Sequence, residues 1–162
     1  MHSFIFQLST RPLSEEQYLS EDAVVFEASR YADYVSELKE GKRAEAITEL
    51  VSSLPSDMFG SNADGTFSYL GGYEKWVKMV FIPHVQEAAM AMKGDKIAGF
   101  GSSYEVKKRV DNPLNTGILF LITDENMFTE AAKQSGDFME DFIGYMEPGT
   151  RIYIGGVYDY YF

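Results

Sequence analysis

The chain has 162 residues, no cysteine and a formal net charge of −11 at pH 7, and 45% of its residues are apolar and 15% aromatic. This length is typical of one domain with a substantial core, and the aromatic content argues against disorder. The absence of cysteine excludes disulfide frameworks, thiolate zinc sites and cysteine nucleophiles. We therefore expect a single α+β domain over residues 1–162.

The charge is distributed unevenly along the chain. Residues 1–74 have 13 acidic and 5 basic side chains, residues 75–109 have 3 and 7, and residues 110–162 have 9 and 2. The three segments therefore carry net charges of −8, +4 and −7. Because lysine and arginine drive most binding to phosphates and anionic lipids, the overall charge disfavours nucleic acid and membrane as direct partners.

No segment has the pattern of a targeting or membrane-spanning element. The N-terminal MHSFIFQLSTR lacks a basic region and a long apolar stretch. No apolar run approaches the roughly 18–20 residues that cross a bilayer. We therefore expect a soluble, cytoplasmic protein.

The N-terminal half of the chain predicts two strands and two helices. Apolar residues on both faces predict a strand over 3–8 that is buried on both sides. Capping-box spacing at 14–17 opens a short helix, and the acidic segment 20–40 fits short helical or irregular pieces. Apolar residues spaced three and four apart predict a helix over 44–54, and 66–70 has the pattern of a strand.

The middle of the chain contains two ambiguous segments. Residues 74–81 and 103–110 each fit a helix and a strand, and both assignments stay open. Gly71-Gly72 is compatible with a tight hairpin turn. Pro83 is expected in the first turn of a helix that ends near residue 93.

Residues 96–146 are predicted to form two strands followed by two helical runs. Residues 96–100 and 117–122 predict strands. Thr123 is a favourable N-cap, so we expect a helix over about 124–132, followed by a second helical run over 137–146.

The C-terminal segment has the pattern of a β-hairpin. Two aromatic-rich strands flank Gly155-Gly156, and a two-residue turn there would pair Tyr153 with Tyr158. The predicted fold is therefore α+β, with a mostly antiparallel sheet, several packed helices and a C-terminal β-hairpin. The expected core includes six residues: Phe4, Phe6, Ile118, Phe120, Phe142 and Ile152.

No motif in the sequence fixes an enzymatic reaction. His84 is the one histidine placed to act as a base, but no nucleophile elbow accompanies it. The serine-bearing loop 99–103 matches neither the Walker A nor the dinucleotide-binding pattern. The turn 62–65 fails as a calcium loop, because glycines occupy positions that require carboxylates. We therefore expect no catalytic residue, no metal and no cofactor.

An acidic cluster lies near the C-terminus. Residues 124–147 contain seven carboxylates and one basic side chain, Lys133. Carboxylates on a rigid helical scaffold can imitate spaced phosphates, a strategy that resembles that of the acidic anti-restriction and anti-CRISPR inhibitors of bacteriophages. The candidate partner-binding residues are these seven: Asp124, Glu125, Glu130, Asp137, Glu140, Asp141 and Glu147. Of these, Asp137, Glu140 and Asp141 are expected to be exposed, since the neighbouring apolar residues occupy the side of the helix that faces the core.

The leading hypothesis is a non-catalytic acidic protein that docks a basic protein partner, in its sharpest form an inhibitor of a nucleic-acid-binding enzyme that acts by nucleic-acid mimicry. One alternative is a small enzyme or ligand-binding domain that uses a carboxylate pair or His84. Another is a structural or assembly protein that associates through its aromatic C-terminal hairpin. A broad negative face with no deep pocket favours the inhibitor, whereas a cleft in which His84 meets carboxylates favours the enzyme.

Overall fold

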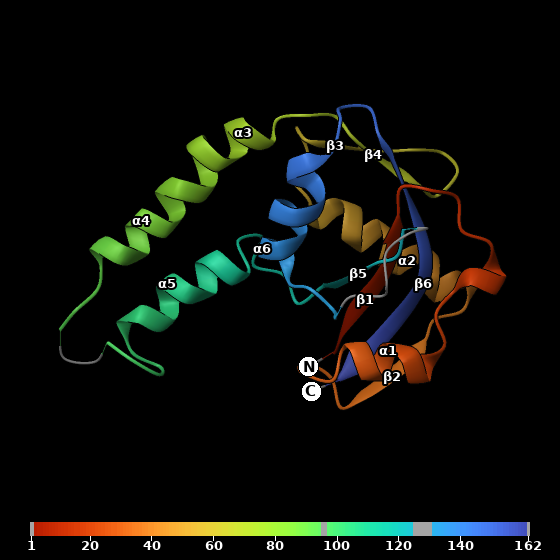
Figure 1. Ribbon diagram of the computed structural model, residues 1–162, viewed down its shortest axis with the longest axis horizontal. Coiled ribbons are helices and arrows are strands. Elements are labelled where there is room, and N and C mark those ends of the chain that lie inside the picture. The colour runs from red at the N-terminus through yellow and green to blue at the C-terminus, as the bar shows by residue number, and fades with distance from the viewer. Residues whose placement is uncertain (1, 95–96, 125–130, 162) are drawn as a thin grey trace.

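The computed structural model describes residues 2–94, 97–124 and 131–161, and its main feature is a six-stranded sheet with helices on both faces (Figure 1). The strands are β1 (His2–Ser9), β2 (Tyr34–Glu37), β3 (Phe59–Ser61), β4 (Phe67–Tyr69), β5 (Leu119–Ile122) and β6 (Arg151–Tyr161). The α-helices are α1 (Glu21–Glu27), α2 (Glu40–Ser53), α3 (Tyr73–Trp76), α4 (Ile82–Met90), α5 (Ser102–Asp111) and α6 (Ser135–Asp137). Two wide π-helical turns, η2 (Val77–Phe81) and η3 (Phe138–Phe142), and two 3₁₀ turns, η1 (Glu15–Gln17) and η4 (Ile143–Tyr145), complete the elements.

The sheet is mostly antiparallel and is not closed. Its strand order is β3-β4-β6-β1-β5, and β2 pairs with the C-terminal part of β6. The β1–β5 pair is parallel and aligns Phe6 with Phe120, whereas the pairs made by β6 are antiparallel. The predicted α+β class and mostly antiparallel sheet are therefore confirmed.

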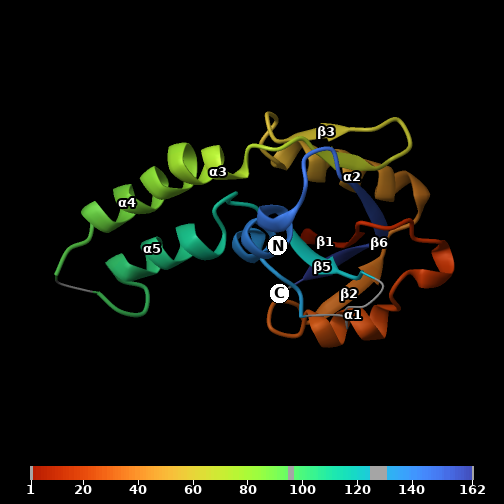
Figure 2. The ribbon, with the colours of Figure 1, turned by 45° about the horizontal axis from the view of Figure 1, so that its top comes forward.

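Two hydrophobic cores lie on the two faces of the sheet. The larger core lies under α2 and contains Phe6, Leu50, Phe120 and Phe138, all fully or almost fully buried. The smaller core lies under α1, which covers the opposite face (Figure 2). Alternate residues of β1 therefore enter different cores, as the apolar pattern of 3–8 predicts. Of the six expected core residues, four are buried and Phe4 and Phe142 are partly buried.

The predicted C-terminal hairpin is wrong at its turn, because β6 continues through Gly155 and Gly156 as one strand. The register between β1 and β6 shifts between Phe6 and Leu8, so that Gln7 alone lies opposite both glycines. This arrangement is a β-bulge, in which one strand carries an extra residue. A glycine pair inside a strand is also typical of a bulge, and here the surrounding sheet selects that outcome over a turn.

The buried amide of Gln7 stabilises the bulge. Its Oε1 accepts hydrogen bonds from the backbone N–H groups of Gly156 and Leu19, both at 3.0 Å. Its Nε2 donates to the carbonyl of Gln17 at 3.1 Å and to Oγ1 of Thr123 at 3.0 Å. The side chain is 1% exposed, so these four bonds satisfy an amide that would otherwise be costly to bury.

The two ambiguous segments are both helical. Residues 74–81 lie in α3 and η2, and 103–110 lie in α5. Pro83 lies in the first turn of α4, as expected, but α4 continues directly from η2. In η2 the N–H of Ile82 donates to the carbonyl of Val77, five residues earlier. Such a widened turn is a known accommodation of a proline inside a helix, because proline supplies no N–H of its own.

Several local predictions are corrected. Gly71-Gly72 leads into α3 rather than into a hairpin. Residues 34–37, expected to be helical or irregular, form an edge strand, and 97–100 form turns rather than the expected strand, of which Lys96 lies outside the described residues. The helix expected over 124–132 is absent at Asp124 and at 131–132, which belong to no helix or strand, and its remaining residues lie outside the described part of the chain.

We expect the fold to lose stability at alkaline pH because of two buried tyrosines. Burial raises the pKa of the Tyr158 phenol and that of Tyr160 above the ordinary value of 10.0. Their hydroxyls donate to the carbonyls of Leu19 and Gly117. The stabilisation is complete below the ordinary tyrosine pKa and is lost as the pH rises from there through the raised pKa of the folded state, because the unfolded chain releases these protons first.

The measurement is the thermal midpoint as a function of pH. Tyr158→Phe removes one of the two groups, so its midpoint is expected to fall less steeply above about pH 10 than that of the parent protein. An identical slope in the two proteins would contradict this role of Tyr158.

Candidate functional site

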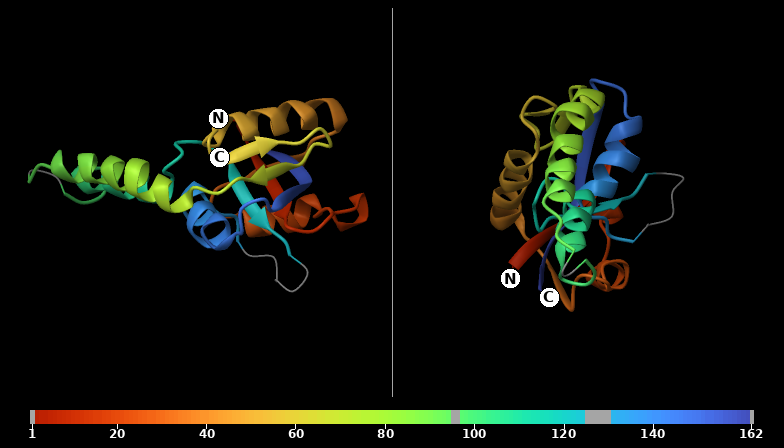
Figure 3. Two further views of the ribbon diagram at one scale, coloured as in Figure 1. Left: turned by 90° about the horizontal axis from the view of Figure 1, so that it is seen from above. Right: turned by 90° about the vertical axis from the view of Figure 1, so that its left-hand side faces the viewer.

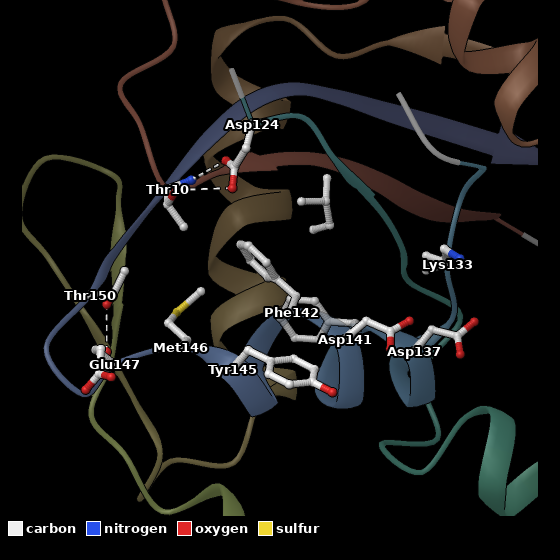
Figure 4. A pocket seen from close by; sticks show the side chains of 12 residues that line it. Thr10, Asp124, Lys133, Asp137, Asp141, Phe142, Tyr145, Met146, Glu147 and Thr150 are labelled. Carbon is white, nitrogen blue, oxygen red and sulfur yellow. Dashed lines mark hydrogen bonds between the residues drawn. The ribbon is translucent and has the colours of Figure 1, made fainter. Parts of the chain in front are cut away.

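A pocket of about 510 Å³ lies beside the helical segment that precedes β6 (Figure 4). The C-terminal end of β5 and the residue that follows β1 form its other wall. Twelve residues line it: Thr10, Ile122, Asp124, Lys133, Asp137, Phe138, Asp141, Phe142, Tyr145, Met146, Glu147 and Thr150. Four of the seven carboxylates that the sequence predicts as partner-binding residues are in this set.

The floor of the pocket is apolar and is anchored in the larger core. Phe138 is 1% exposed and stacks on Phe120, with ring centroids 4.0 Å apart and planes inclined by 8°. The ring of Phe142 lies against Phe138 at 5.8 Å and is only partly buried. Tyr145 extends this apolar surface outward and is 86% exposed. Because core packing fixes Phe138, the floor has a defined position relative to the sheet.

Carboxylates from three places in the chain surround this floor. Asp137 and Asp141 lie one helical turn apart, at the end of α6 and in η3, and both are exposed. In the view of Figure 4, these two side chains lie on one side of Phe142 and Glu147 lies on the other. Lys133 is the one basic side chain in the lining and offsets part of the negative charge.

The fourth carboxylate, that of Asp124, is held in place by hydrogen bonds. Its Oδ1 accepts from Oγ of Ser9 at 2.8 Å and from the backbone N–H of Thr10 at 2.9 Å. Its Oδ2 accepts from Oγ1 of Thr10 at 3.2 Å. Asp124 therefore ties the end of β5 to the end of β1 and presents a carboxylate of fixed orientation to the pocket.

The remaining predicted site residues do not join this pocket. Glu140 is exposed, as are Asp137 and Asp141, so the expected exposure of all three is confirmed. Glu140 lines a separate hollow next to Tyr73, where burial, aided by the negative charge of Glu140, raises the pKa of the Tyr73 phenol. Glu125 and Glu130 lie outside the described residues.

Residues proposed for other chemistries lie elsewhere. His84 is on α4 and is not part of the pocket, and its backbone carbonyl accepts a hydrogen bond of 2.8 Å from Nη1 of Arg109. Within the described residues, no three histidine, aspartate or glutamate side chains gather as a metal site would require. Tyr158 and Tyr160 are buried in the sheet, so the C-terminal aromatics do not form the exposed hairpin surface that the assembly hypothesis requires.

Sequence reasoning missed the apolar floor. Tyr145 follows Asp141 by four residues, so helical spacing alone places an aromatic ring next to a predicted carboxylate. Thr10 and Ile122 had no comparable signal, because only the parallel pairing of β1 with β5 brings them to the pocket.

Fold and pocket together define an α+β protein with an apolar hollow ringed by carboxylates. No known protein family, curated protein or solved structure matches this chain. Among the described residues, no helix combines the length and apolar character that crossing a membrane requires.

Proposed function

We propose that this protein is a non-catalytic acidic binding protein whose pocket takes a basic segment of a partner protein. The supporting observation is the convergence of Asp124, Asp137, Asp141 and Glu147 around one apolar floor. A pocket of several hundred cubic ångströms with a few convergent polar groups has the character of a binding site.

The chemistry of the pocket suits a lysine or arginine flanked by apolar residues. Such side chains combine an apolar stem with a charged head. The stem or an apolar neighbour would pack on Phe142 and Met146, and the head would meet the carboxylates of the rim. Asp124 suits a guanidinium best, because a carboxylate of fixed orientation favours the planar fork of arginine.

In its sharper form the proposal is that the partner is a nucleic-acid-binding enzyme, which the protein inhibits in the cytoplasm by occupying its basic groove. The charge of −7 over residues 110–162 supports this form, because it would attract a basic surface over long range and speed association. The exposed carboxylates of η3 would then stand where phosphates stand in the enzyme's own substrate.

The test is the affinity of a labelled peptide rich in arginine and leucine for two charge-reversal variants. Asp137→Lys/Asp141→Lys alters the pocket, and Glu45→Lys/Glu49→Lys alters exposed residues four apart on α2. Each reversal changes the charge by two units, so both variants go from −11 to −7. The pocket variant is expected to bind at least about 30-fold more weakly than the parent, because losing a charged contact costs about 2 kcal/mol or more.

The α2 variant separates the pocket from bulk charge. It is expected to bind within about threefold of the parent, since only long-range attraction is reduced. Equal losses in the two variants would mean that the peptide responds to net charge alone, and the pocket would not be the site.

A further inference from the structure

Two helical segments, the continuous run α3-η2-α4 and the helix α5, form an arm that extends from the rest of the molecule. The helical arm is defined here as residues 73–94 and 97–111, which contain α3, η2, α4 and α5. In Figures 1 and 2, α4 and α5 lie side by side and point away from the sheet, and the left panel of Figure 3 shows the same projection from above.

The outer end of the helical arm is apolar and exposed. Met90 is 87% exposed and Phe100 is 89% exposed, and Ile97 is 58% exposed. The ring of Phe100 contacts Tyr104, with centroids 5.3 Å apart, and Tyr104 is itself exposed. Exposed apolar side chains gathered at the end of a projection are typical of an interaction site.

The helical arm is also the basic part of an otherwise acidic chain. Its described residues include six basic and four acidic side chains, a net charge of +2. Arg109 contacts two of the acidic side chains, Glu87 at 3.0 Å and Glu105 at 3.3 Å. Lys93 is exposed beside the outer end, and the other exposed lysines of the arm lie on α3, η2 and the second half of α5, nearer the sheet. The segments on either side of the arm, residues 1–72 and 112–162, carry −7 and −6.

The positive charge of the arm indicates which kinds of surface its apolar end could bind. A second arm packed against the first would bring two positive segments together. An anionic lipid surface would attract the arm but repel the acidic remainder of the molecule. The carboxylate-ringed pocket of another molecule has the opposite charge and an apolar floor, so it complements both features of the arm.

We propose that the end of the helical arm of one copy docks in the carboxylate-ringed pocket of a second copy. This inference rests on the proposed function, because it names a partner for the same pocket. Met90 and Phe100 pack on the apolar floor, and Lys93 faces the carboxylate rim. Reciprocal docking of two arms closes the assembly as a two-fold dimer.

Sedimentation of complementary variants tests this arrangement. Met90→Glu/Phe100→Glu makes the arm repel the pocket, and Asp137→Lys/Asp141→Lys makes the pocket repel the arm. At low salt the parent protein is expected to dimerise at about 100 μM. Each variant alone is expected to be monomeric at that concentration, and an equimolar mixture is expected to form a one-to-one complex, because it retains one intact arm and one intact pocket.

Three outcomes would overturn the proposal. They are a monomeric parent protein, a pocket variant that still dimerises, or a mixture that does not associate. The substituted residues are exposed, so far-ultraviolet circular dichroism is expected to be unchanged, and Phe100→Ser provides a milder arm variant if the double one unfolds.

The peptide experiment separates this proposal from the proposed function. If the peptide binds the pocket while the parent protein stays monomeric, self-docking is rejected and the proposed function stands. If the complementary mixture associates while the peptide does not bind, the pocket is a self-association site and the proposed function fails.

Discussion

Replacing Phe120 with alanine is expected to lower the free energy of unfolding by about 3–5 kcal/mol. Phe120 is fully buried in β5, and its ring stacks on Phe138 at 4.0 Å. The substitution removes apolar contacts from the larger core and leaves a cavity beneath the floor of the pocket. Denaturant unfolding measures the loss, with the thermal midpoint as a second readout.

The matched control for this substitution is Phe26→Ala. Phe26 lies in α1 and is 76% exposed, so its truncation is expected to change stability by less than about 0.5 kcal/mol. An unchanged thermal midpoint in Phe120→Ala would contradict the burial of Phe120 in the larger core.

Gly156→Ala is expected to cost at least about 3 kcal/mol, at the upper end of the range for overpacking. A Cβ at this position would lie 1.9 Å from the hydroxyl and 2.4 Å from the Cζ atom of Tyr158. Tyr158 is fully buried and donates to the carbonyl of Leu19, so its ring cannot move without breaking that bond and repacking the smaller core.

Gly41→Ala is the control, and it is expected to raise the stability of the protein rather than lower it. Gly41 lies in the first turns of α2, and a Cβ there would meet nothing within 4 Å. Alanine favours the helix over glycine by up to about 1 kcal/mol, so this variant is expected to be more stable than the parent. If Gly156→Ala were as stable as the parent, the bulge would not be as tightly packed as the structure places it.

The fold was predictable where apolar periodicity and burial agree. The strand over 3–8, the strand over 117–122 and the helix over 44–54 follow from such patterns, and the structure confirms all three as β1, β5 and α2 within a few residues. Local spacing suffices there because each segment packs its apolar residues against one or two cores.

The errors arise where a local signal depends on its surroundings. Gly155-Gly156 has the local pattern of a hairpin turn, but the pairing of β6 with β1 places a bulge there, where Gly156 donates to the buried Gln7. Residues 97–100 alternate like a strand, yet they lie between α4 and α5 at the end of the helical arm, where no strand of the described residues pairs with them.

The sequence predicted carboxylates of the candidate site, but it did not predict the shape of the pocket that they line. The density of carboxylates over 124–147 is visible in the sequence, and four of them line the pocket. Glu140, one residue before Asp141, lines a different hollow, because consecutive helical residues point in directions about 100° apart. The apolar floor depends on the packing of Phe138 on Phe120, a contact that no local pattern predicts.

The central claim is that the carboxylate-ringed pocket binds a basic segment, and peptide titration of isotope-labelled protein observed by NMR tests it most directly. We expect saturable amide shifts at Thr10, Asp124 and residues 133–147, with α2 unchanged. These shifts are expected to weaken as salt is added, because screening acts on the exposed carboxylates. Saturable shifts confined to the helical arm or to α2, or no saturable shifts at low salt, would contradict the claim.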